Sequence, residues 1–566
     1  MRILLLVHAF NSLSQRIFSE LEQARHDVSV EFDVNDAVTK EAVALFNPDV
    51  IVAPFLKRAV AEDVWRNVPC LIVHPGIPGD RGPSALDWAI LNNEDQWGVT
   101  VLQAEAGMDT GPIWAWMEAP LRPASKSSLY RNEITQAAVA AVKQALERIE
   151  TEQYIPLRAE QLGLEVLGQE RLSAKQMDRK IGWLIDDTKI VLRKLRSADG
   201  VPGVRDSVLG RSVFLHDGRE APGLSGYPGD IIAKSGPAIC RATVDGAVWI
   251  GHVWDKDSDH PFKLPATMVF KDELSDIEEI LLDSESGYSE IRYEEKGQVG
   301  YLHFDFYNGA MGVAQCERLL AAYKQACQCD TKVIVLMGGR DFWSNGMHLN
   351  LIEADDSPAD YSWQNINAID DLAEEIIRTE SHVTVAALQG NVGAGGVFLA
   401  RACDQVWLRE GIMLSPHYKD MGNLYGSEFW TYLLPRYAGE ENARRIIDAR
   451  LPMGTQEAVE LGLADACFGK AITDFIAEVS QHTEDLDADC LIASKQERRL
   501  ADEKLKPLSE YRREELEKMR LNFYGFDPSY HVARYNFVYK IPKSRTPLTI
   551  ARHRDKRETN ERRVAS

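Results

Sequence analysis

Short apolar segments alternate with longer helical stretches in two separate blocks of the 566-residue chain, and this rhythm limits the fold more than any other feature. Apolar runs separated by helical stretches are typical of βαβ units, which build a parallel sheet covered by helices. The expected strands are Arg2–Val7, Val28–Phe32, Val50–Ala53, Leu71–Val73 and Trp97–Gln103 in the first block, and Val299–Phe304, Val333–Met337, Val383–Leu388 and Gln405–Leu408 in the second. The sequence therefore predicts a multidomain α/β protein.

The segment between the two blocks has a different pattern. From about residue 165 to 275, short strands are separated by turn pairs such as Asp217-Gly218 and Asp245-Gly246, which predicts a small antiparallel, OB-like β-barrel. A prior of roughly 150 residues per domain gives three to four domains. We expect a Rossmann-like domain at 1–165, the β-barrel at 166–275, a second α/β domain at 276–485, and at 486–566 a helical extension. In that extension we expect a helix over 495–519, an aromatic loop and a basic tail.

The charge balance excludes one large class of function. Lys and Arg number 64 against 86 Asp and Glu, which gives a net charge of −22. Nucleic-acid binding needs a basic face, so no nucleic-acid partner is expected, and an anionic ligand has to be met by a local group of arginines. No run approaches the roughly 18 apolar residues of a membrane span, so no membrane partner is expected. Eight scattered cysteines indicate a reducing cytoplasm, and together with 13 unclustered histidines they predict no metal site.

The densest group of reactive residues in the first block surrounds His74. This histidine follows an apolar strand, at the carboxyl edge of the expected sheet, where ligands of such folds bind. Asp109 lies in a glycine-flanked turn after the next strand, where its carboxylate can orient the imidazole. Taken alone, the pair is equally consistent with a packed histidine and a capped turn.

The residues around this pair resemble the formyltetrahydrofolate-dependent formyltransferases. The string His74-Pro75-Gly76-Ile77-Pro78-Gly79-Asp80-Arg81-Gly82 matches, with one residue fewer, that family's His-x-Ser-Leu-Leu-Pro-x-x-Arg-Gly loop, and residues 109–112 match its Asp-x-Gly-Pro turn. The resemblance covers about residues 1–255. It implies 10-formyltetrahydrofolate as the formyl donor and places His74 and Asp109 at the catalytic positions. Arg81 and Gln15 are further candidates for cofactor binding.

Ile72 departs from the pattern of that family. The formyltransferases have Asn at this position, two residues before the histidine, and its amide helps to hold the oxyanion of the tetrahedral intermediate. Losing one such donor costs on the order of 3 kcal/mol of transition-state stabilisation. Either the domain has low or no formyl-transfer activity toward amine acceptors, or its acceptor needs less stabilisation of the oxyanion. We favour a thiol acceptor, because a thiolate is intrinsically more nucleophilic.

Two glycine-rich turns mark the second block. One strand leads to residues 342–349, around Met347, and another leads to Gly390-Asn391-Val392-Gly393-Ala394-Gly395-Gly396. Glycines where a strand turns into a helix expose backbone N–H groups, and two such turns facing each other form an oxyanion hole for a thioester carbonyl. Close packing of strand on helix explains one such cluster but poorly explains two. The strings resemble the enoyl-CoA hydratase/isomerase (crotonase) superfamily over about residues 288–475, which places the N–H groups of Met347 and Gly395 at its oxyanion positions.

Side chains at the hydratase positions contradict hydration. Hydratases carry two glutamates 20 residues apart, and this chain has Phe398 and Tyr418 there. We expect Phe398 to line the acyl-CoA pocket and exclude water from the thioester. Glu428, ten residues after Tyr418, is the candidate base, and Tyr418 is expected to orient the thioester or relay the proton, although these two roles are interchangeable. The alternatives are a solvated acid at a helix start for Glu428 and plain packing for Tyr418.

A formyl-donor site and an acyl-CoA site on one chain indicate two successive reactions. Formyl would move to the thiol of coenzyme A, and formyl-CoA, which has no α-carbon, would then lose carbon monoxide. This domain order resembles the nickel–iron hydrogenase maturation proteins of the HypX/HoxX type, which implies a cytoplasmic protein with other maturation proteins as partners. Two alternatives stay open: a formyltransferase or formyl-folate hydrolase with a CoA-binding, non-catalytic C-terminal domain, and a non-catalytic maturation scaffold.

The CoA phosphates require local positive charge in this acidic chain. The candidates are Arg131, Arg193, Arg196 and the tail residues Lys543, Arg545 and Arg552. The alternatives are that each is a solvated surface charge, or that the tail docks an acidic maturation partner.

Overall fold

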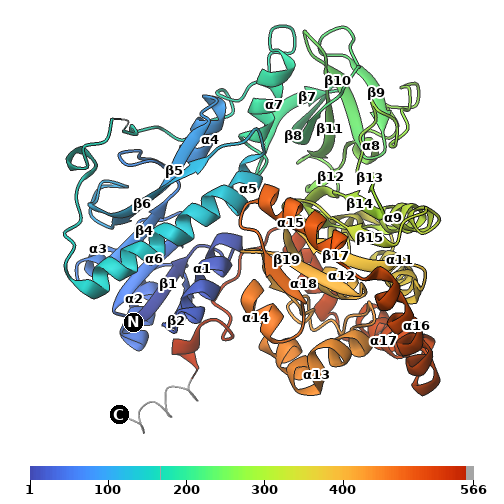
Figure 1. Ribbon diagram of the computed structural model, residues 1–566. Helices are drawn as coiled ribbons and strands as arrows, with labels where there is room; N and C mark the ends of the chain where they lie inside the picture. The colour runs from blue at the N-terminus through green and yellow to red at the C-terminus, as the bar shows by residue number, and fades with distance from the viewer. Residues whose placement is uncertain (166, 556–566) are drawn as a thin grey trace. The chain divides into compact units, whose positions relative to one another are not determined.

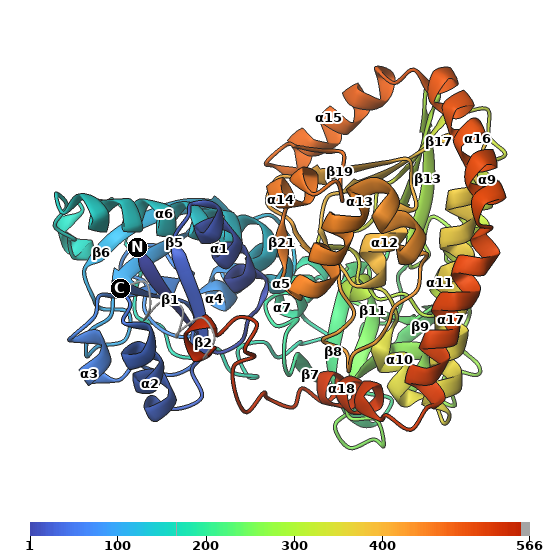
Figure 2. The same ribbon diagram turned by 90° about the horizontal axis from the view of Figure 1, so that it is seen from below.

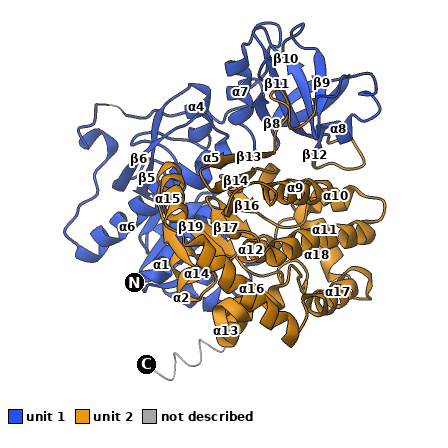
Figure 3. Cartoon of the chain, turned by 45° about the vertical axis from the view of Figure 1, so that its right-hand side comes forward, with its two compact units in different colours: residues 1–255, 265–280, 543–566 blue, residues 256–264, 281–542 orange. Residues whose placement is uncertain are grey.

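The computed structural model describes residues 1–165 and 167–555, and the chain divides into two compact units (Figure 3). Unit 1 comprises residues 1–255, residues 265–280 and the segment that starts at Lys543. Unit 2 comprises residues 256–264 and 281–542.

The first part of unit 1 is a six-stranded sheet in the order β2-β1-β3-β4-β5-β6 (Figure 1). Its strands are β1 (Arg2–Val7), β2 (Asp27–Phe32), β3 (Val50–Phe55), β4 (Cys70–His74), β5 (Gln96–Gln103) and β6 (Ile113–Pro120). The first four are parallel, as predicted, whereas β5 is antiparallel to both β4 and β6, so that the sheet is mixed.

Helices cover both faces of this sheet (Figure 2). α1 (Ser12–Gln23) and α6 (Thr135–Thr151) lie together on one face, and α2 (Asp36–Phe46) and α3 (Glu62–Trp65) lie on the other. Leu4 and Leu6 of β1 pack with Phe46 of α2, whereas the alternate residues of β1 point to the opposite face. All of Ile3–Val7 is buried, which explains why this strand is a continuous apolar run.

The second part of unit 1 is an antiparallel sheet, as the turn-rich segment predicts. Strands β7 (Val204–Val208), β8 (Arg211–Glu220), β11 (Ala247–Trp254), β10 (Ala238–Ala242) and β9 (Ile231–Ser235) pair in this order. The amphipathic helix α7 (Thr188–Arg196) packs its buried face on β8. Closure of the sheet into an OB-like barrel remains a prediction.

Unit 2 contains a larger and a smaller sheet. The larger has the order β13 (Ile291–Lys296), β14 (Val299–Phe304), β15 (Val333–Leu336), β17 (Val383–Leu388), β19 (Gln405–Arg409) and β22 (Ala466–Phe468), parallel from β14 onward. The smaller has the order β16 (Phe342–Ser344), β18 (Asn391–Gly393), β20 (Met413–Ser415) and β21 (Met453–Gly454). Because β16, β18 and β20 are parallel, their carboxyl ends meet at one edge.

The helices that matter for the second site are α9 (Val313–Ala326), α11 (Pro358–Arg378), α12 (Gly395–Arg401) and α13 (Trp430–Ala449). The other α-helices before residue 485 are α4 (Ala85–Leu91), α5 (Lys126–Leu129), α8 (Ala266–Val269), α10 (Leu349–Ala354), α14 (Thr455–Glu460) and α15 (Ile472–Glu484).

The C-terminal extension differs from the prediction in two ways. The expected helix over 495–519 is two helices, α16 (Ala488–Leu505) and α17 (Leu508–Tyr524), because Pro507 lacks the N–H that a continuous helix needs. The expected aromatic loop contains a helix, α18 (Ser529–Val538). Tertiary contacts explain it: the Tyr530 hydroxyl lies 2.7 Å from Ser362 Oγ, and Arg534 forms a 2.6 Å ion pair with Glu353.

The described part of the basic tail is built into unit 1 and is not a free arm. Ile550 accepts a 2.9 Å hydrogen bond from the Val30 N–H of edge strand β2. His553 Nε2 lies 2.9 Å from Glu31 Oε2, and Arg554 donates to the same oxygen over 2.6 Å. Since Glu31 is 1% exposed, the tail neutralises a buried carboxylate of the first sheet. The rest of the predicted tail, 556–566, lies outside the described residues.

Candidate active sites

The carboxyl end of β4 presents His74 between two carboxylates. Its Nε2 lies 3.0 Å from Oδ1 of Asp80, and its Nδ1 lies 3.5 Å from Oδ2 of Asp109. Asp109 has a left-handed backbone (φ 54°) in the predicted turn, and its Oδ2 accepts a 3.1 Å hydrogen bond from the Gly82 N–H. The structure therefore brings together the two residues that the sequence singled out, and it adds a third.

At the first site, Asp80 is a functional candidate that sequence reasoning missed. It is 1% exposed, and Arg171 Nε lies 3.6 Å from its Oδ2. Gly168 packs so closely that a Cβ on it would lie 2.2 Å from the backbone nitrogen of Asp80, which shows how tightly the loop is held. The only signal in the sequence is the position of Asp80 within the loop, because its contact with His74 depends on how the loop folds back.

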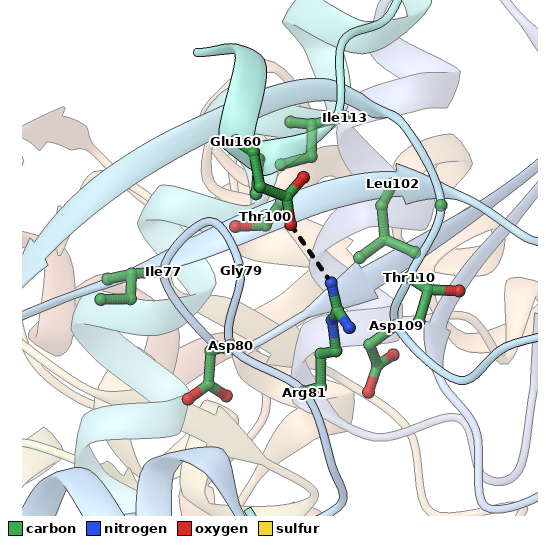
Figure 4. Close-up of a pocket in the computed structure, with 12 residues that line it drawn as sticks. Ile77, Gly79, Asp80, Arg81, Thr100, Leu102, Asp109, Thr110, Ile113 and Glu160 are labelled. Carbon is green, nitrogen blue, oxygen red and sulfur yellow. Dashed lines mark ion pairs between the residues drawn. The ribbon is translucent and has the colours of Figure 1, made fainter. Parts of the chain in front are cut away.

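A small pocket opens beside this group, and Asp80, Arg81, Asp109 and Thr110 are among the residues that line it (Figure 4). The guanidinium of Arg81 points toward Glu160, with an N–O distance of 3.5 Å. Charged side chains therefore border this pocket, among them Asp80 and Asp109, the two carboxylates that contact His74.

Ile72 stands on β4 two residues before His74 and so points to the same side of the strand. It is half-buried and packs against the apolar group of Leu102 and Ile113, which also line the cavity. The position where formyltransferases carry an amide is thus part of an apolar wall.

The other candidate cofactor residues of unit 1 are dispersed. Gln15 of α1 donates its side-chain amide to the Phe10 carbonyl over 3.0 Å, and α1 contacts the π-helical turn Tyr130–Ile134 that holds Arg131. Arg193 and Arg196 lie on α7, and burial lowers the pKa of Arg196. Arg545 is exposed. Of the predicted arginines, only Arg81 lines the cavity beside His74.

Two tail residues complete the predicted set of CoA-phosphate candidates. Lys543 is exposed, whereas Arg552 forms a 2.5 Å ion pair with Glu22 of α1. Arg552 is therefore already paired with a carboxylate, and its contact with a ligand phosphate stays a prediction.

The second site lies where β16, β18 and β20 end. Met347 follows β16, and Gly395 begins α12 after β18. A Cβ on Gly346 would lie 3.4 Å from the backbone nitrogen of Gly395, so the two predicted oxyanion turns face each other at close range. Between β18 and α12, Ala394 has a positive φ of 48°, a strained conformation of the kind that concentrates at functional sites.

The two residues at the hydratase positions stack on each other. The rings of Phe398 and Tyr418 have centroids 5.4 Å apart and an interplanar angle of 20°. Phe398 is 0% exposed and Tyr418 is 7% exposed. Two packed aromatic rings therefore occupy the place where a hydratase activates water.

Tyr418 and Glu428 form a close polar pair at this site. The Tyr418 hydroxyl donates to Glu428 Oε2 over 2.6 Å, and a Cβ on Gly395 would lie 2.0 Å from Glu428 Oε1. The carboxylate thus bridges the phenol and the oxyanion turn. Glu428 is 1% exposed, so the alternative of a solvated acid is wrong. Burial and the charge of Asp370 raise the pKa of Glu428 to about 8, and burial beside Glu428 raises the pKa of Tyr418 well above its usual value.

Two further buried carboxylates surround this pair and were not predicted. Asp370 of α11 and Glu515 of α17 are both 0% exposed. Burial raises the pKa of Asp370 to about 7 and that of Glu515 to about 8. Their positions in amphipathic helices look like ordinary polar positions, and only the packing of the helices shows that they point inward.

None of the helices in the described part of the chain has the length and apolar character of a membrane span. Across residues 1–165 and 167–555, no three His, Cys, Asp or Glu side chains are grouped as metal ligands would be.

The fold and the two sites define a formyltransferase-like half joined to a crotonase-like half. The family model for formyl transferase matches residues 19–146, and that for enoyl-CoA hydratase/isomerase matches residues 307–527. Methionyl-tRNA formyltransferase of Anaeromyxobacter dehalogenans is 26% identical over 214 residues, which are 36% of this chain and 67% of that protein.

Two relatives match essentially the whole chain. Hydrogenase maturation factor HoxX of Bradyrhizobium diazoefficiens is 54% identical over 562 residues, covering 98% of each chain. The crystal structure of HypX from Aquifex aeolicus in complex with tetrahydrofolic acid superposes with a TM-score of 0.94 at 46% identity, covering 98% of this chain and 99% of that one. The chain belongs to the HypX/HoxX family of hydrogenase maturation factors.

Proposed function

We propose that this protein makes carbon monoxide in two steps. Formyl is transferred from 10-formyltetrahydrofolate to coenzyme A beside His74, and formyl-CoA is then split into carbon monoxide and coenzyme A beside Glu428. The contact that carries the proposal is the buried 2.6 Å hydrogen bond between Tyr418 and Glu428 in a site walled by Phe398. Glu428 is a base in a site that lacks the two carboxylates with which hydratases activate water. This suits a reaction that consumes no water.

In the first step, the thiol loses its proton and its sulfur attacks the formyl carbon. The C–N10 bond then breaks, and N10 of the folate takes up one proton, so that tetrahydrofolate and formyl-CoA result. The proton passes from sulfur to N10 through the group formed by His74, Asp80 and Asp109. A thiol acceptor fits the apolar Ile72, since the better nucleophile depends less on the missing oxyanion donor. The tetrahydrofolate in the crystal structure of the Aquifex aeolicus relative supports a folate substrate here.

In the second step, the thioester oxygen is held by the N–H groups of Met347 and Gly395. Glu428 takes the formyl hydrogen as a proton, the C–S bond breaks, and its electron pair leaves with the sulfur. The remaining carbon and oxygen depart as carbon monoxide. The proton returns to the thiolate from Glu428 or through Tyr418, and no net proton is gained or lost. Stacked aromatic rings next to the base disfavour attack by water, which would give formate.

Placing both steps on one chain raises the effective concentration of a labile intermediate. We propose coenzyme A and the folate as its small-molecule partners and other hydrogenase maturation proteins as its protein partners.

Incubation of the protein with 10-formyltetrahydrofolate and coenzyme A, with deoxyhaemoglobin as reporter, tests the proposal. Carbon monoxide that depends on both substrates supports it. Formate in place of the gas would instead support a formyltransferase or hydrolase whose C-terminal half only binds CoA. If the protein neither turns over nor binds either substrate, the result would support a non-catalytic maturation scaffold.

A further inference from the structure

The turn that carries Glu428 has an unusual backbone. Glu428 and the following Phe429 have positive φ angles of 58° and 59°. Residues other than glycine rarely adopt the left-handed backbone conformation. Two such residues in succession persist only where several surrounding contacts hold them in place. Something outside the turn must therefore hold it.

Two carboxylates from different helices hold this turn. Asp370 of α11 accepts the Glu428 N–H at Oδ1 over 2.9 Å and the Ser427 hydroxyl at Oδ2 over 2.8 Å. Glu515 of α17 accepts the Phe429 N–H at Oε2 over 2.9 Å and the Thr431 N–H at Oε1 over 2.8 Å. Ser427 Oγ also lies 3.3 Å from Glu515 Oε2, so this hydroxyl bridges the two acids.

Burying Asp370 and Glu515 costs free energy, which indicates that they have a specific role. A buried carboxylate loses its hydration, and an apolar side chain of similar volume is usually tolerated better at such a place. The nearest cation on α17, Arg512, forms ion pairs of 2.6 Å with Asp371 and 2.9 Å with Glu374, so its charge is already shared. Glu515 also lies where the first turn of α13 presents its N–H groups, a favourable place for negative charge.

We infer that Asp370 and Glu515 are positioning residues of the second site: they hold the left-handed turn that aims the Glu428 carboxylate at Tyr418 and Gly395. The role assigned to the reacting carboxylate rests on the proposed function. The raised pKa values of Asp370 and Glu515 agree with their burial next to Glu428.

Isosteric amides test this inference. In Glu515→Gln, one of the two oxygens that accept backbone N–H groups becomes an NH2 group, which cannot accept. In Asp370→Asn, the single amide oxygen can accept from either the Glu428 N–H or the Ser427 hydroxyl, but not from both. We expect the kcat for carbon monoxide release from added formyl-CoA to fall about 100-fold, as for small misplacements of a reacting group, with little change in KM. Formyl transfer from 10-formyltetrahydrofolate should be unchanged.

Neighbouring acids supply matched controls. Asp371→Asn and Glu514→Gln remove the same charge one position away, from side chains that are 52% and 50% exposed. They should retain wild-type rates. If the controls slow the release as much as the two test variants do, or if the test variants keep the wild-type kcat, the inference is overturned.

An infrared titration separates this inference from the proposed function. The titratable groups that face Glu428 are Cys316 of α9, Asp370 of α11, Tyr418 after β20 and Glu515 of α17. The C=O band of protonated Glu428 is assigned by its loss in Glu428→Gln. We expect this band to shift and to titrate at lower pH in Asp370→Asn, because a like charge is gone. An unchanged band in both test variants overturns the inference, whether or not the wild type releases carbon monoxide. A wild type that releases no carbon monoxide overturns only the proposed function.

Discussion

The Tyr418 hydroxyl donates a 2.6 Å hydrogen bond to Oε2 of Glu428, and the two groups are shut off from solvent. In water such a pair would exchange partners freely, whereas here burial raises the proton affinity of both groups. The pair offers a base and a proton donor within one hydrogen bond of each other, next to the oxyanion turn at Gly395.

Removing either member of this pair should stop the second step alone. Glu428→Gln removes the proton acceptor, and we expect a loss of about 10²- to 10⁴-fold in carbon monoxide release from formyl-CoA. Tyr418→Phe removes the donor and should also slow the release. Tyr425→Phe, in the same loop but 37% exposed, is the matched control and should keep the wild-type rate. Gas release that persists in Glu428→Gln would contradict the assignment of the base.

The rate of the second step should rise with pH. The pKa of Glu428 is raised to about 8, so the group is protonated at lower pH and unable to accept the formyl proton. Release from formyl-CoA should therefore increase up to about pH 8 and then level off, while Tyr418, with its raised pKa, stays protonated. Stopped-flow recording of carbonmonoxyhaemoglobin at saturating formyl-CoA gives this profile. A profile that falls over pH 6 to 8 (roughly the range below that pKa) would show that the acid form is the active one.

Asp80 should matter for formyl transfer as much as Asp109 does. Its 3.0 Å contact fixes the Nε2 side of His74, and Asp80→Asn should favour the wrong tautomer or ring orientation. By comparison with orienting acids of other catalytic histidines, the loss can approach about 10⁴-fold. The measurement is tetrahydrofolate release in the presence of coenzyme A, with the exposed Asp95→Asn as control. Carbon monoxide release from added formyl-CoA should be unchanged in both variants. If Asp80→Asn keeps the wild-type rate of formyl transfer, Asp80 has no role in that step.

A carboxylate at a hydratase position should redirect the second step. Phe398→Glu places a water-activating group beside the thioester, and we expect formate to replace part of the carbon monoxide. Phe398→Leu keeps the position apolar and should still release the gas, more slowly because it leaves a gap beside Tyr418. The two products are quantified by formate dehydrogenase and by haemoglobin. If Phe398→Glu folds and still releases only carbon monoxide, exclusion of water by this ring is not what protects formyl-CoA.

The tail should stabilise unit 1 through Glu31. A double variant, His553→Ala with Arg554→Ala, leaves this 1% exposed carboxylate without two of its partners. Oε2 of Glu31 then has no partner, while Oε1 keeps its contacts with Thr546 and the Phe32 N–H. A buried acceptor without a partner costs about 1–3 kcal/mol, so the free energy of unfolding should fall by about this amount. Glu41→Gln, which removes the 59% exposed partner of Arg554, should change it by less than about 0.5 kcal/mol. Equal denaturant midpoints for the double variant and the wild type would show that the tail does not brace this sheet.

The sequence was sufficient for the features that are local or repeat along the chain. The alternation of strands and helices, the two glycine turns and the aromatic residues at positions 398 and 418 all follow from short strings, and the structure confirms the strands and brings those residues together. His74 and Asp109 were also predictable, because His74 ends β4 and Asp109 lies in the turn between β5 and β6.

Contacts between segments far apart in the chain could not be predicted from the sequence. Asp370 and Glu515 are separated by 145 positions and meet only because α11 and α17 pack side by side. Asp80 contacts His74 only because a glycine-rich loop folds back, and the tail at His553 pairs with a strand near the other end of the chain. Charged residues in such places look like surface residues until their partners are known.

Isotope tracing from folate to gas tests the central claim most directly. The protein is given 10-formyltetrahydrofolate labelled with ¹³C in the formyl group, and the released gas is captured on haemoglobin and identified by its infrared band. We predict ¹³CO only when coenzyme A is present, with unlabelled coenzyme A recovered unchanged. Labelled formate without labelled gas, or labelled gas formed in the absence of coenzyme A, would contradict it.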